Sequence, residues 1–192
     1  QSWQHWQKVC IIPVDIRVLY IAWRDCLMCG IVAYIGAKDA PPIILHGLKR
    51  LEYRGYDSAG MATIQDGQIN IRRDVGKLAR LQNLVSEQPL SGNIGIGHTR
   101  WATHGEPNER NAHPHMGATG EVVIVHNGIV ENYISLREQL LSAGVTLKSD
   151  TDSEVIVHLV EQYMAAGYPF KDAVGHTIGE LQGASAMVLI TT

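Results

Sequence analysis

The residue with the most distinctive chemistry in this sequence is Cys29, which follows Met28 and precedes the apolar stretch GIVAYIG. If translation starts at Met28 and the methionine is removed, as is usual before a small second residue, Cys29 becomes the N-terminal residue. It then carries both a thiol and a free α-amine, with pKa values of about 8.5 and about 8, so the amine can accept the thiol proton near neutral pH. One residue would thus supply a nucleophile for a carbonyl carbon together with its base.

Four stretches after Cys29 hold more glycine and polar side chains than packing requires. They are YRGYDSAG at 53–60, GHTRWATHGEPN at 97–108, HNG at 126–128 and SDTDSE at 149–154. Each is expected at the end of a strand or the start of a helix, where functional groups tend to be displayed.

Asn127-Gly128 is ordinarily typical of a hairpin turn, but a helical pattern follows it instead of a second strand, so we reject the turn. A side-chain amide beside a glycine N–H offers the two donors that an oxyanion hole needs. We therefore predict that Asn127 and Gly128 stabilise a developing oxyanion.

Arg100 and Asp152 supply opposite charges at two of these stretches. A guanidinium can hold a carboxylate by two N–H groups, although a surface ion pair explains Arg100 equally well. Asp152 is predicted in the first turn of a helix, where the helix dipole favours a carboxylate. Together the two residues have the charges needed to bind the carboxylate and ammonium of an amino acid.

Three weaker patterns do not persuade us of a metal or cofactor site. Cys26 and Cys29 form a CxxC, typical of a redox pair or half a zinc site, but no second pair follows. His113 and His115 have no third ligand pattern, so we interpret them as structural or site-lining. GIG at 95–97 lacks the third glycine of a dinucleotide fingerprint.

Hydrophobic periodicity predicts strands at 30–35, 59–64, 68–73, 94–98, 121–126 and 186–190. Helices are expected from Pro41 toward Arg54, over 77–86, from Tyr133 to Gly144, after a capping box at 151–154, and over 170–181. Asp66-Gly67 predicts a two-residue hairpin. Mixed strands and helices of this kind indicate an α+β layered fold with mixed or antiparallel sheets.

Composition favours one globular domain in 192 residues, with 45% hydrophobic residues and a net charge of −3. The scattered basic residues argue against nucleic acid or an anionic membrane as partner, and the apolar run at 9–23 is too short and too charged to span a membrane. All three cysteines lie within the first 29 residues, which fits a reducing compartment such as the cytoplasm.

Residues 1–28 differ in character from the rest and are predicted to be an upstream extension outside the mature domain, or a propeptide whose removal exposes Cys29. Residues 29–192 are predicted to form the domain. Its C-terminal end is expected to be incomplete, because the sequence stops directly after strand residues.

Taken together, the motifs CGIVAYIG, LEYRGYDSAG, HTRWATHGEPN, NAHPH and VVIVHNGIVENY resemble the glutaminase domain of the glutamine:fructose-6-phosphate amidotransferase family. The first motif alone indicates a class II glutamine amidotransferase, and the others narrow the resemblance to the sugar-phosphate enzymes of amino-sugar biosynthesis. The resemblance runs from Cys29 to Thr192 and implies a four-layer αββα sandwich of the N-terminal-nucleophile hydrolase type.

The resemblance also implies roles for individual residues. Cys29 is the nucleophile, Asn127 and Gly128 form the oxyanion hole, and Arg100 and Asp152 grip glutamine. Further members of the site are implied to be the following: Arg54 and Gly55 against the cysteine, and Trp101, Thr103 and His104 lining the pocket.

The implied reaction is hydrolysis of L-glutamine to glutamate and ammonia through a γ-glutamyl thioester, without metal or cofactor. The implied partners are sugar-isomerase domains that receive the ammonia for fructose 6-phosphate, in a homo-oligomeric full-length enzyme. Two alternatives stay open: an amidotransferase with another acceptor such as phosphoribosyl pyrophosphate, and a glutamine-binding module whose cysteine is blocked by the upstream residues.

Overall fold

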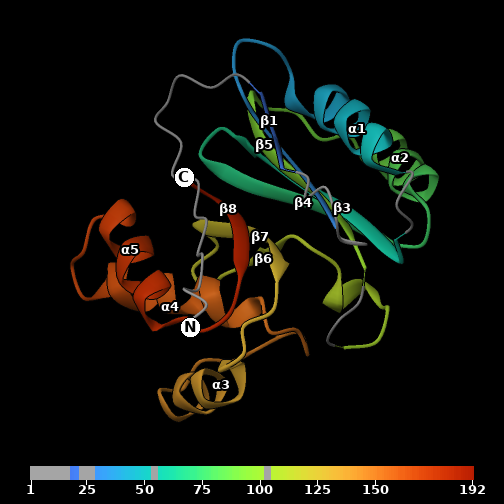
Figure 1. Ribbon diagram of the computed structural model, residues 1–192. Coiled ribbons are helices and arrows are strands. Elements are labelled where there is room, and N and C mark those ends of the chain that lie inside the picture. The colour runs from blue at the N-terminus through green and yellow to red at the C-terminus, as the bar shows by residue number, and fades with distance from the viewer. Residues whose placement is uncertain (1–17, 22–28, 53–55, 102–104) are drawn as a thin grey trace, which may run out of the picture.

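Two antiparallel sheets form the centre of the fold in the computed structural model, which describes residues 18–21, 29–52, 56–101 and 105–192. The first sheet has the strand order β1-β2-β5-β3-β4 and the second has the order β6-β7-β8. Figure 1 shows the sheets facing each other, with helices on the outer face of each.

The first sheet consists of β1 Val18–Ile21, β2 Gly30–Ile35, β3 Ser58–Gln65, β4 Gln68–Val75 and β5 Ile94–Arg100. Helices α1 Ala40–Leu51 and α2 Leu78–Glu87 cover its outer face (Figure 1). The second sheet consists of β6 His115–Met116, β7 Val122–Gly128 and β8 Ser185–Thr191. Helix α4 Glu154–Ala165 packs on its outer face, and α3 Tyr133–Ser142 and α5 Phe170–Glu180 pack against α4.

Three buried clusters fill the spaces between these layers. Ile44 and Leu48 of α1 pack with Val32 of β2 on the outer side of the first sheet. Ile96 of β5 and Val123 of β7 belong to a second cluster, between the two sheets. The third cluster joins the second sheet to its helices. The layer order is therefore helix, sheet, sheet, helix, which confirms the predicted four-layer αββα sandwich.

Most predicted elements are present, with ends shifted by a few residues. Asp66 and Gly67 connect β3 to β4 with φ angles of 50° and 73°, the pair of positive values that a type I′ hairpin turn needs. The strand predicted at 121–126 is β7, which lies in the middle of its sheet. A helix and not a strand follows Gly128, so the rejection of a hairpin there is confirmed.

The sequence patterns missed three short elements. β1 pairs antiparallel with β2 from within the predicted extension, β6 has two residues, and a 3₁₀ helix spans Glu109–Asn111. Strands and turns this short have too few residues to show a period.

The predicted capping box at 151–154 is wrong. Helix α4 begins at Glu154, and neither Ser153 nor another side chain caps it. The Glu154 carboxylate instead accepts the backbone N–H groups of Lys148 and Ser149, both at 2.7 Å, because the chain before the helix folds back over it. Asp152 consequently precedes the helix, so the prediction that it lies in the first turn is wrong.

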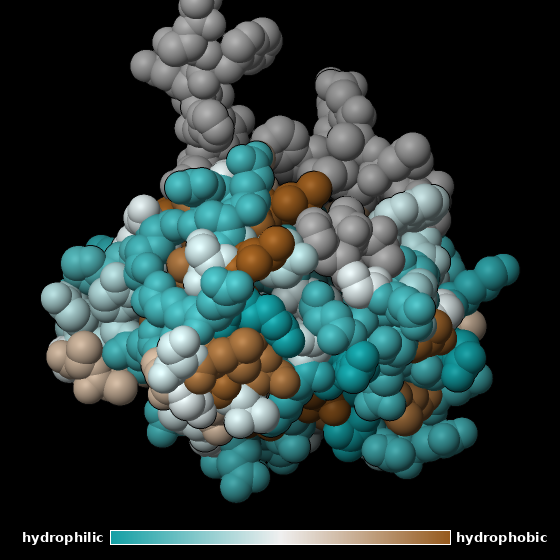
Figure 2. All heavy atoms as spheres, turned by 90° about the horizontal axis from the view of Figure 1, so that it is seen from below, coloured by the Kyte–Doolittle hydropathy of each residue, from teal (hydrophilic) through white to brown (hydrophobic). Residues whose placement is uncertain are grey.

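The outer surface carries separate hydrophobic patches among mostly hydrophilic side chains, as seen on the face shown in Figure 2. Exposed large hydrophobic residues include Ile134 and Leu141 on α3. In the described part of the chain, no helix is both long and apolar enough to cross a membrane.

Candidate active site

Cys29 lies directly before β2, at the end of the first sheet. The backbone N–H of Gly30 donates to Thr99 Oγ1 at 3.0 Å, and the two residues are partners in the β2–β5 ladder. A Cβ on residue 30 would lie 2.7 Å from Leu51 Cδ1 and 2.9 Å from Thr99 Oγ1. A larger residue there would have to displace Leu51 and Thr99, so glycine allows the close packing beside Cys29.

The Cys29 thiol contacts the backbone of Trp101. The Trp101 N–H donates to Sγ at 2.9 Å, and Sγ lies 3.7 Å from the Trp101 carbonyl oxygen. Burial raises the pKa of the Cys29 thiol, against the lowering effect of the Trp101 N–H. Because only the thiolate is a strong nucleophile, this sulfur needs a base to take its proton at neutral pH.

Asn127 and Gly128 form the end of β7 that reaches Cys29. Asn127 Nδ2 donates to the carbonyl oxygen of Cys29 at 2.7 Å, and Asn127 Oδ1 lies 2.7 Å from His98 Nε2. Gly128 has a φ of 139°, and a Cβ there would lie 2.2 Å from the Ala184 carbonyl oxygen. No other residue fits this backbone, so the amide–glycine pair is held at the backbone of Cys29.

Arg100 and Asp152 are both buried, with 4% and 3% of their surface exposed. Arg100 Nη1 lies 3.6 Å from Asp57 Oδ1, so Arg100 has an ion-pair partner, but it is buried and not the surface arginine of the alternative interpretation. Asp152 Oδ2 accepts the backbone N–H of Val130 at 2.8 Å. Both carboxylate and guanidinium are therefore oriented by the fold.

A pocket of about 100 Å³ brings the described candidates together. It is lined by Cys29, His98, Arg100, Trp101, His113, His126, Asn127, Gly128, Ile129, Thr151, Asp152 and Ser153. Four further predicted site residues, Arg54, Gly55, Thr103 and His104, lie outside the described residues. Six predicted residues from four separate segments thus converge on one pocket with a thiol, an amide and two opposite charges.

Three of the described histidines line the pocket wall: the sequence interpretation included His113, as structural or site-lining, but missed His98 and His126. His98 stacks on His113 with ring centroids 4.3 Å apart, and His113 Nδ1 accepts the backbone N–H of His126 at 3.1 Å. Burial lowers the pKa of His98 to about 3 and that of His126 to about 4. Both histidines occur inside the polar stretches identified from the sequence, His98 in GHTR and His126 in HNG. Their place in these stretches is the sequence signal that could have identified them.

These imidazoles are neutral at neutral pH and too weakly basic to accept a thiol proton. Among the residues that the structure describes, no group of His, Cys, Asp and Glu side chains is arranged to hold a metal ion.

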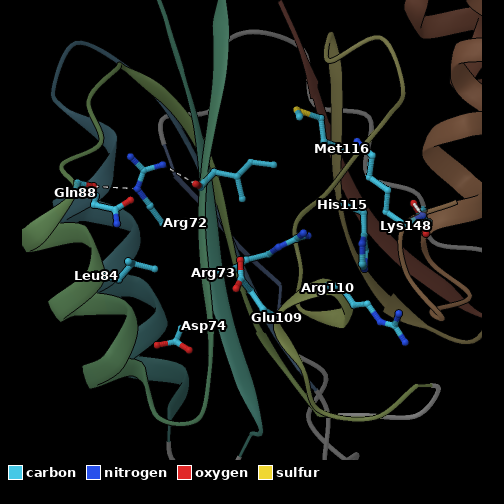
Figure 3. Close-up of a pocket in the computed structure, with 12 residues that line it drawn as sticks. Arg72, Arg73, Asp74, Leu84, Gln88, Glu109, Arg110, His115, Met116 and Lys148 are labelled. Atoms are coloured by element: carbon cyan, nitrogen blue, oxygen red, sulfur yellow. Dashed lines mark hydrogen bonds between the residues drawn. The ribbon is translucent and has the colours of Figure 1, made fainter. Parts of the chain in front are cut away.

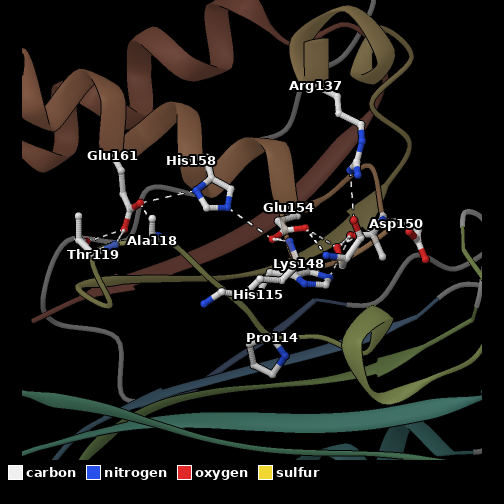
Figure 4. A network of polar contacts seen from close by, with 12 residues as sticks. Pro114, His115, Ala118, Thr119, Arg137, Lys148, Asp150, Glu154, His158 and Glu161 are labelled. Carbon is white, nitrogen blue, oxygen red and sulfur yellow. Dashed lines mark hydrogen bonds and ion pairs between the residues drawn. The ribbon is translucent and has the colours of Figure 1, made fainter. Parts of the chain in front are cut away.

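A second buried network is centred on His158 of α4, between Glu154 and Glu161 (Figure 4). His158 Nε2 lies 3.4 Å from Glu154 Oε1, and His158 Nδ1 lies 3.7 Å from Glu161 Oε2. Burial alone would lower the pKa of His158, but the two carboxylates outweigh it and raise the pKa to about 9. The glutamates in turn hold the backbone N–H groups of two loops, at Lys148, Ser149, Ala118 and Thr119.

A larger cavity of about 540 Å³ opens between β4 and β6 (Figure 3). Two of its arginines bind within the protein: Arg72 donates to the Gln88 carbonyl, and Arg73 donates to the carbonyls of Ala112 and Pro114. Of the predicted catalytic and substrate-binding residues that the structure describes, none lines it.

Residues 82–170 match the family model described as a glutamine amidotransferase domain. The chain is 52% identical to the glutamine–fructose-6-phosphate aminotransferase (isomerizing) of Pyrococcus horikoshii, over 85% of this chain and 27% of that protein. It is 50% identical to the enzyme of the same name from Clostridium acetobutylicum, over 86% of this chain and 27% of that protein. The chain thus spans about a quarter of the length of these relatives.

The fold is similar to two solved structures. One is the glutamine phosphoribosylpyrophosphate amidotransferase of B. subtilis complexed with ADP and GMP, with a TM-score of 0.71, 25% identity, and coverage of 85% of this chain and 35% of that chain. The other is described as the allosteric regulatory enzyme of purine biosynthesis, with a TM-score of 0.72, 26% identity and the same coverage.

Proposed function

This chain carries a glutamine amidotransferase domain, and from that premise we propose that it hydrolyses L-glutamine to glutamate and ammonia at Cys29. The observation that carries the proposal is one pocket lined by Cys29, by Asn127, whose amide binds the Cys29 carbonyl oxygen, and by a buried guanidinium and a buried carboxylate.

Arg100 and Asp152 are proposed to select the substrate. The Arg100 guanidinium would bind the α-carboxylate of glutamine and the Asp152 carboxylate its α-ammonium, leaving the side-chain amide directed at Cys29. Trp101, Thr103 and His104 would complete the wall of the pocket, and Arg54 and Gly55 would lie against the cysteine. Burial of both charged groups strengthens their discrimination, because little water screens them.

The base is proposed to be the α-amine of Cys29 itself, in an active form that begins at this residue. The buried thiol holds its proton at neutral pH, and His98 and His126 are too weakly basic to remove it. A free α-amine has a pKa of about 8 and meets the requirement. Residues 1–28 convert that amine into an amide, which is not a base, so they are proposed to be absent from the active form.

The proposed reaction proceeds through a thioester. The thiolate attacks the amide carbon, and the side-chain amide of Asn127 and the backbone N–H of Gly128 stabilise the tetrahedral oxyanion. The C–N bond then breaks as the α-ammonium of Cys29 returns its proton to the leaving nitrogen, which departs as ammonia. Water, deprotonated by the same amine, attacks the γ-glutamyl thioester, and glutamate leaves as the thiol is restored.

Fructose 6-phosphate is the proposed acceptor of the ammonia, in isomerase domains that this sequence does not include. The support is the name of the relatives, which are about 50% identical, compared with 25% for the phosphoribosylpyrophosphate enzyme. We further propose a homo-oligomeric, cytoplasmic full-length protein that binds neither nucleic acid nor membrane.

The test compares glutamate release from glutamine by three chains: one starting at Met28, the same chain with Cys29→Ala, and the full 192-residue chain. Only the first should turn over, once mass spectrometry shows that Met28 has been removed. Equal turnover by the alanine variant would refute the proposal. Calorimetric binding of glutamine by the Met28-start chain without turnover would favour the binding-module alternative.

A further inference from the structure

The side-chain amide of Asn127 has two possible orientations that differ in function. Rotation by 180° about its last bond exchanges the NH₂ donor for the carbonyl acceptor, with almost no change in shape. Only the orientation with NH₂ toward Cys29 stabilises an oxyanion, whereas the other presents a partial negative charge to it. Something in the structure must therefore choose between them.

Both ends of the Asn127 amide have partners. Nδ2 lies 2.7 Å from the Cys29 carbonyl oxygen, which can only accept a hydrogen bond. Oδ1 lies 2.7 Å from His98 Nε2 and can likewise only accept, so this nitrogen must carry a proton. The pair of contacts is consistent with one orientation of the amide and one tautomer of the imidazole.

His98 is held firmly enough to impose that choice. It is 1% exposed, lies on β5 between its ladder partners Ile31 and Gly60, and stacks on His113. Burial keeps it neutral, with a pKa of about 3, so it has one N–H to give.

The neighbouring imidazole of His126 is committed elsewhere. Its Nδ1 lies 2.8 Å from Ser153 Oγ and its Nε2 lies 3.0 Å from Ser185 Oγ. His113 uses its Nδ1 to accept the His126 backbone N–H. Among the described hydrogen bonds, His98 thus provides the contact to Asn127 Oδ1.

We propose that His98 is a positioning residue, whose Nε2–H fixes the Asn127 amide with its NH₂ group toward Cys29. Its proposed role is exerted through the Asn127 amide. The inference deepens the proposed function, since the catalytic consequence requires that Cys29 hydrolyse glutamine.

The kinetic test uses two substitutions in the active form of the chain. In His98→Gln the side-chain NH₂ can replace the Nε2–H donor, whereas His98→Leu removes it. His98→Leu should lower kcat by about 10²-fold, the typical loss of one oxyanion donor, with KM changed less than about threefold. His98→Gln should keep kcat within about fivefold of the unmodified chain. An equal decrease of kcat in both variants, or a rise of KM with kcat unchanged, would overturn the proposal.

A double-mutant cycle separates positioning from general damage to the fold. If His98 acts through Asn127, then His98→Leu should slow the Asn127→Ala chain no further, because the amide it orients is gone. Independent, multiplying effects of the two substitutions would contradict the inference.

A spectroscopic measurement decides the inference even if no chain hydrolyses glutamine, an outcome that would refute the proposed function alone. Imidazole ¹⁵N shifts of His98 should show a neutral ring protonated at Nε2 from pH 8 down to about pH 5, since its pKa is about 3. A ring protonated at Nδ1, or one that titrates near its ordinary value, would overturn the proposal.

Discussion

Two groups of buried histidines in this fold have opposite charge states. His98, His113 and His126 line the candidate pocket, and His115 packs against His113; each of these four, the pocket group, is at most 3% exposed. His158 lies on α4 and is 2% exposed. Yet the pKa values of the pocket group lie well below the ordinary value, whereas that of His158 is raised to about 9.

The difference arises from the partners and not from the degree of burial. The pocket imidazoles contact an amide oxygen, hydroxyl groups and one another, so loss of water disfavours their charged form. The carboxylates of Asp152 and Glu154 raise the pKa values of His126 and His115, but desolvation outweighs them. His158 contacts two carboxylates, whose attraction for its charged form outweighs the cost of desolvation. Burial alone therefore does not predict whether a histidine is charged.

The two states suit different tasks. A neutral imidazole in the pocket has one donor with a fixed direction, as the orientation of the Asn127 amide requires. A charged imidazole between Glu154 and Glu161 instead compensates two carboxylates that together hold the loops at 118–119 and 148–149. The second loop leads directly to Asp152 in the candidate site.

The largest expected effect is acid destabilisation by the pocket group. Their folded-state pKa values, about 3 for His98 and His115 and about 4 for His126, lie below the unfolded value of 6.5. The unfolded chain therefore binds more protons below pH 6.5, and each histidine should cost about 1.4 kcal/mol of stability per pH unit down to its folded pKa. Glu154, with a pKa lowered to about 2, adds to the loss below pH 4.5.

Urea unfolding at pH 7, 6, 5 and 4 measures this slope. His126→Asn should flatten it by about 1.4 kcal/mol per pH unit, whatever its effect at pH 7. A free energy of unfolding that stays constant from pH 6.5 to 4.5 would show that these imidazoles are not held neutral.

The next largest loss of stability is expected when the charged histidine, His158, is removed. His158→Leu leaves two buried carboxylates near each other without a cation, and breaking a buried pair in this way costs about 3–5 kcal/mol. His158→Gln, which retains a donor, should cost less. The free energy of unfolding at pH 7 checks both, and adding Glu161→Gln to the leucine variant should recover part of the loss. No recovery would mean that packing, and not charge, explains the defect.

The sequence could predict some members of the pocket but not the contacts that distinguish the two groups of histidines. Motifs identified the pocket residues Cys29, Asn127 and Arg100, and strand alternation places His98 on the same face as Ile96. The partner of His98 lies 29 residues away on β7, and that pairing depends on how the two sheets face each other. Local patterns do not contain this information.

Glu154 illustrates the same limit. A carboxylate at the start of a helix can cap that helix or bind a neighbouring loop, and the sequence pattern favoured the first choice. In the structure it accepts from Lys148 and Ser149 and lies beside His158. The outcome is decided by the path of the loop, which is a tertiary feature.

A smaller effect is expected on the alkaline side, from His158 alone. Its folded pKa of about 9 lies above the unfolded value of 6.5, so its stabilisation is complete below pH 6.5 and is lost as pH rises toward 9. The loss should reach about 3 kcal/mol at most. Unfolding at pH 6.5, 8 and 9 measures it, and His158→Gln should remove the decline while leaving the acid limb in place. An unchanged decline in that variant would assign it to other groups.

The smallest effect should come from an exposed ion pair between Arg110 of the 3₁₀ helix and Asp150, which follows the loop at 148–149. Arg110 Nη2 lies 2.6 Å from Asp150 Oδ2, but their side chains are 61% and 47% exposed. Water and salt screen such pairs, so Arg110→Ala should change the free energy of unfolding by less than about 1 kcal/mol, and less still in 0.5 M salt. The buried pair at His158 should show no comparable salt dependence. If Arg110→Ala costs as much as His158→Leu, then the loop that contains Asp150 limits stability. In that case burial of charge does not explain the difference between the exposed pair and the buried pair.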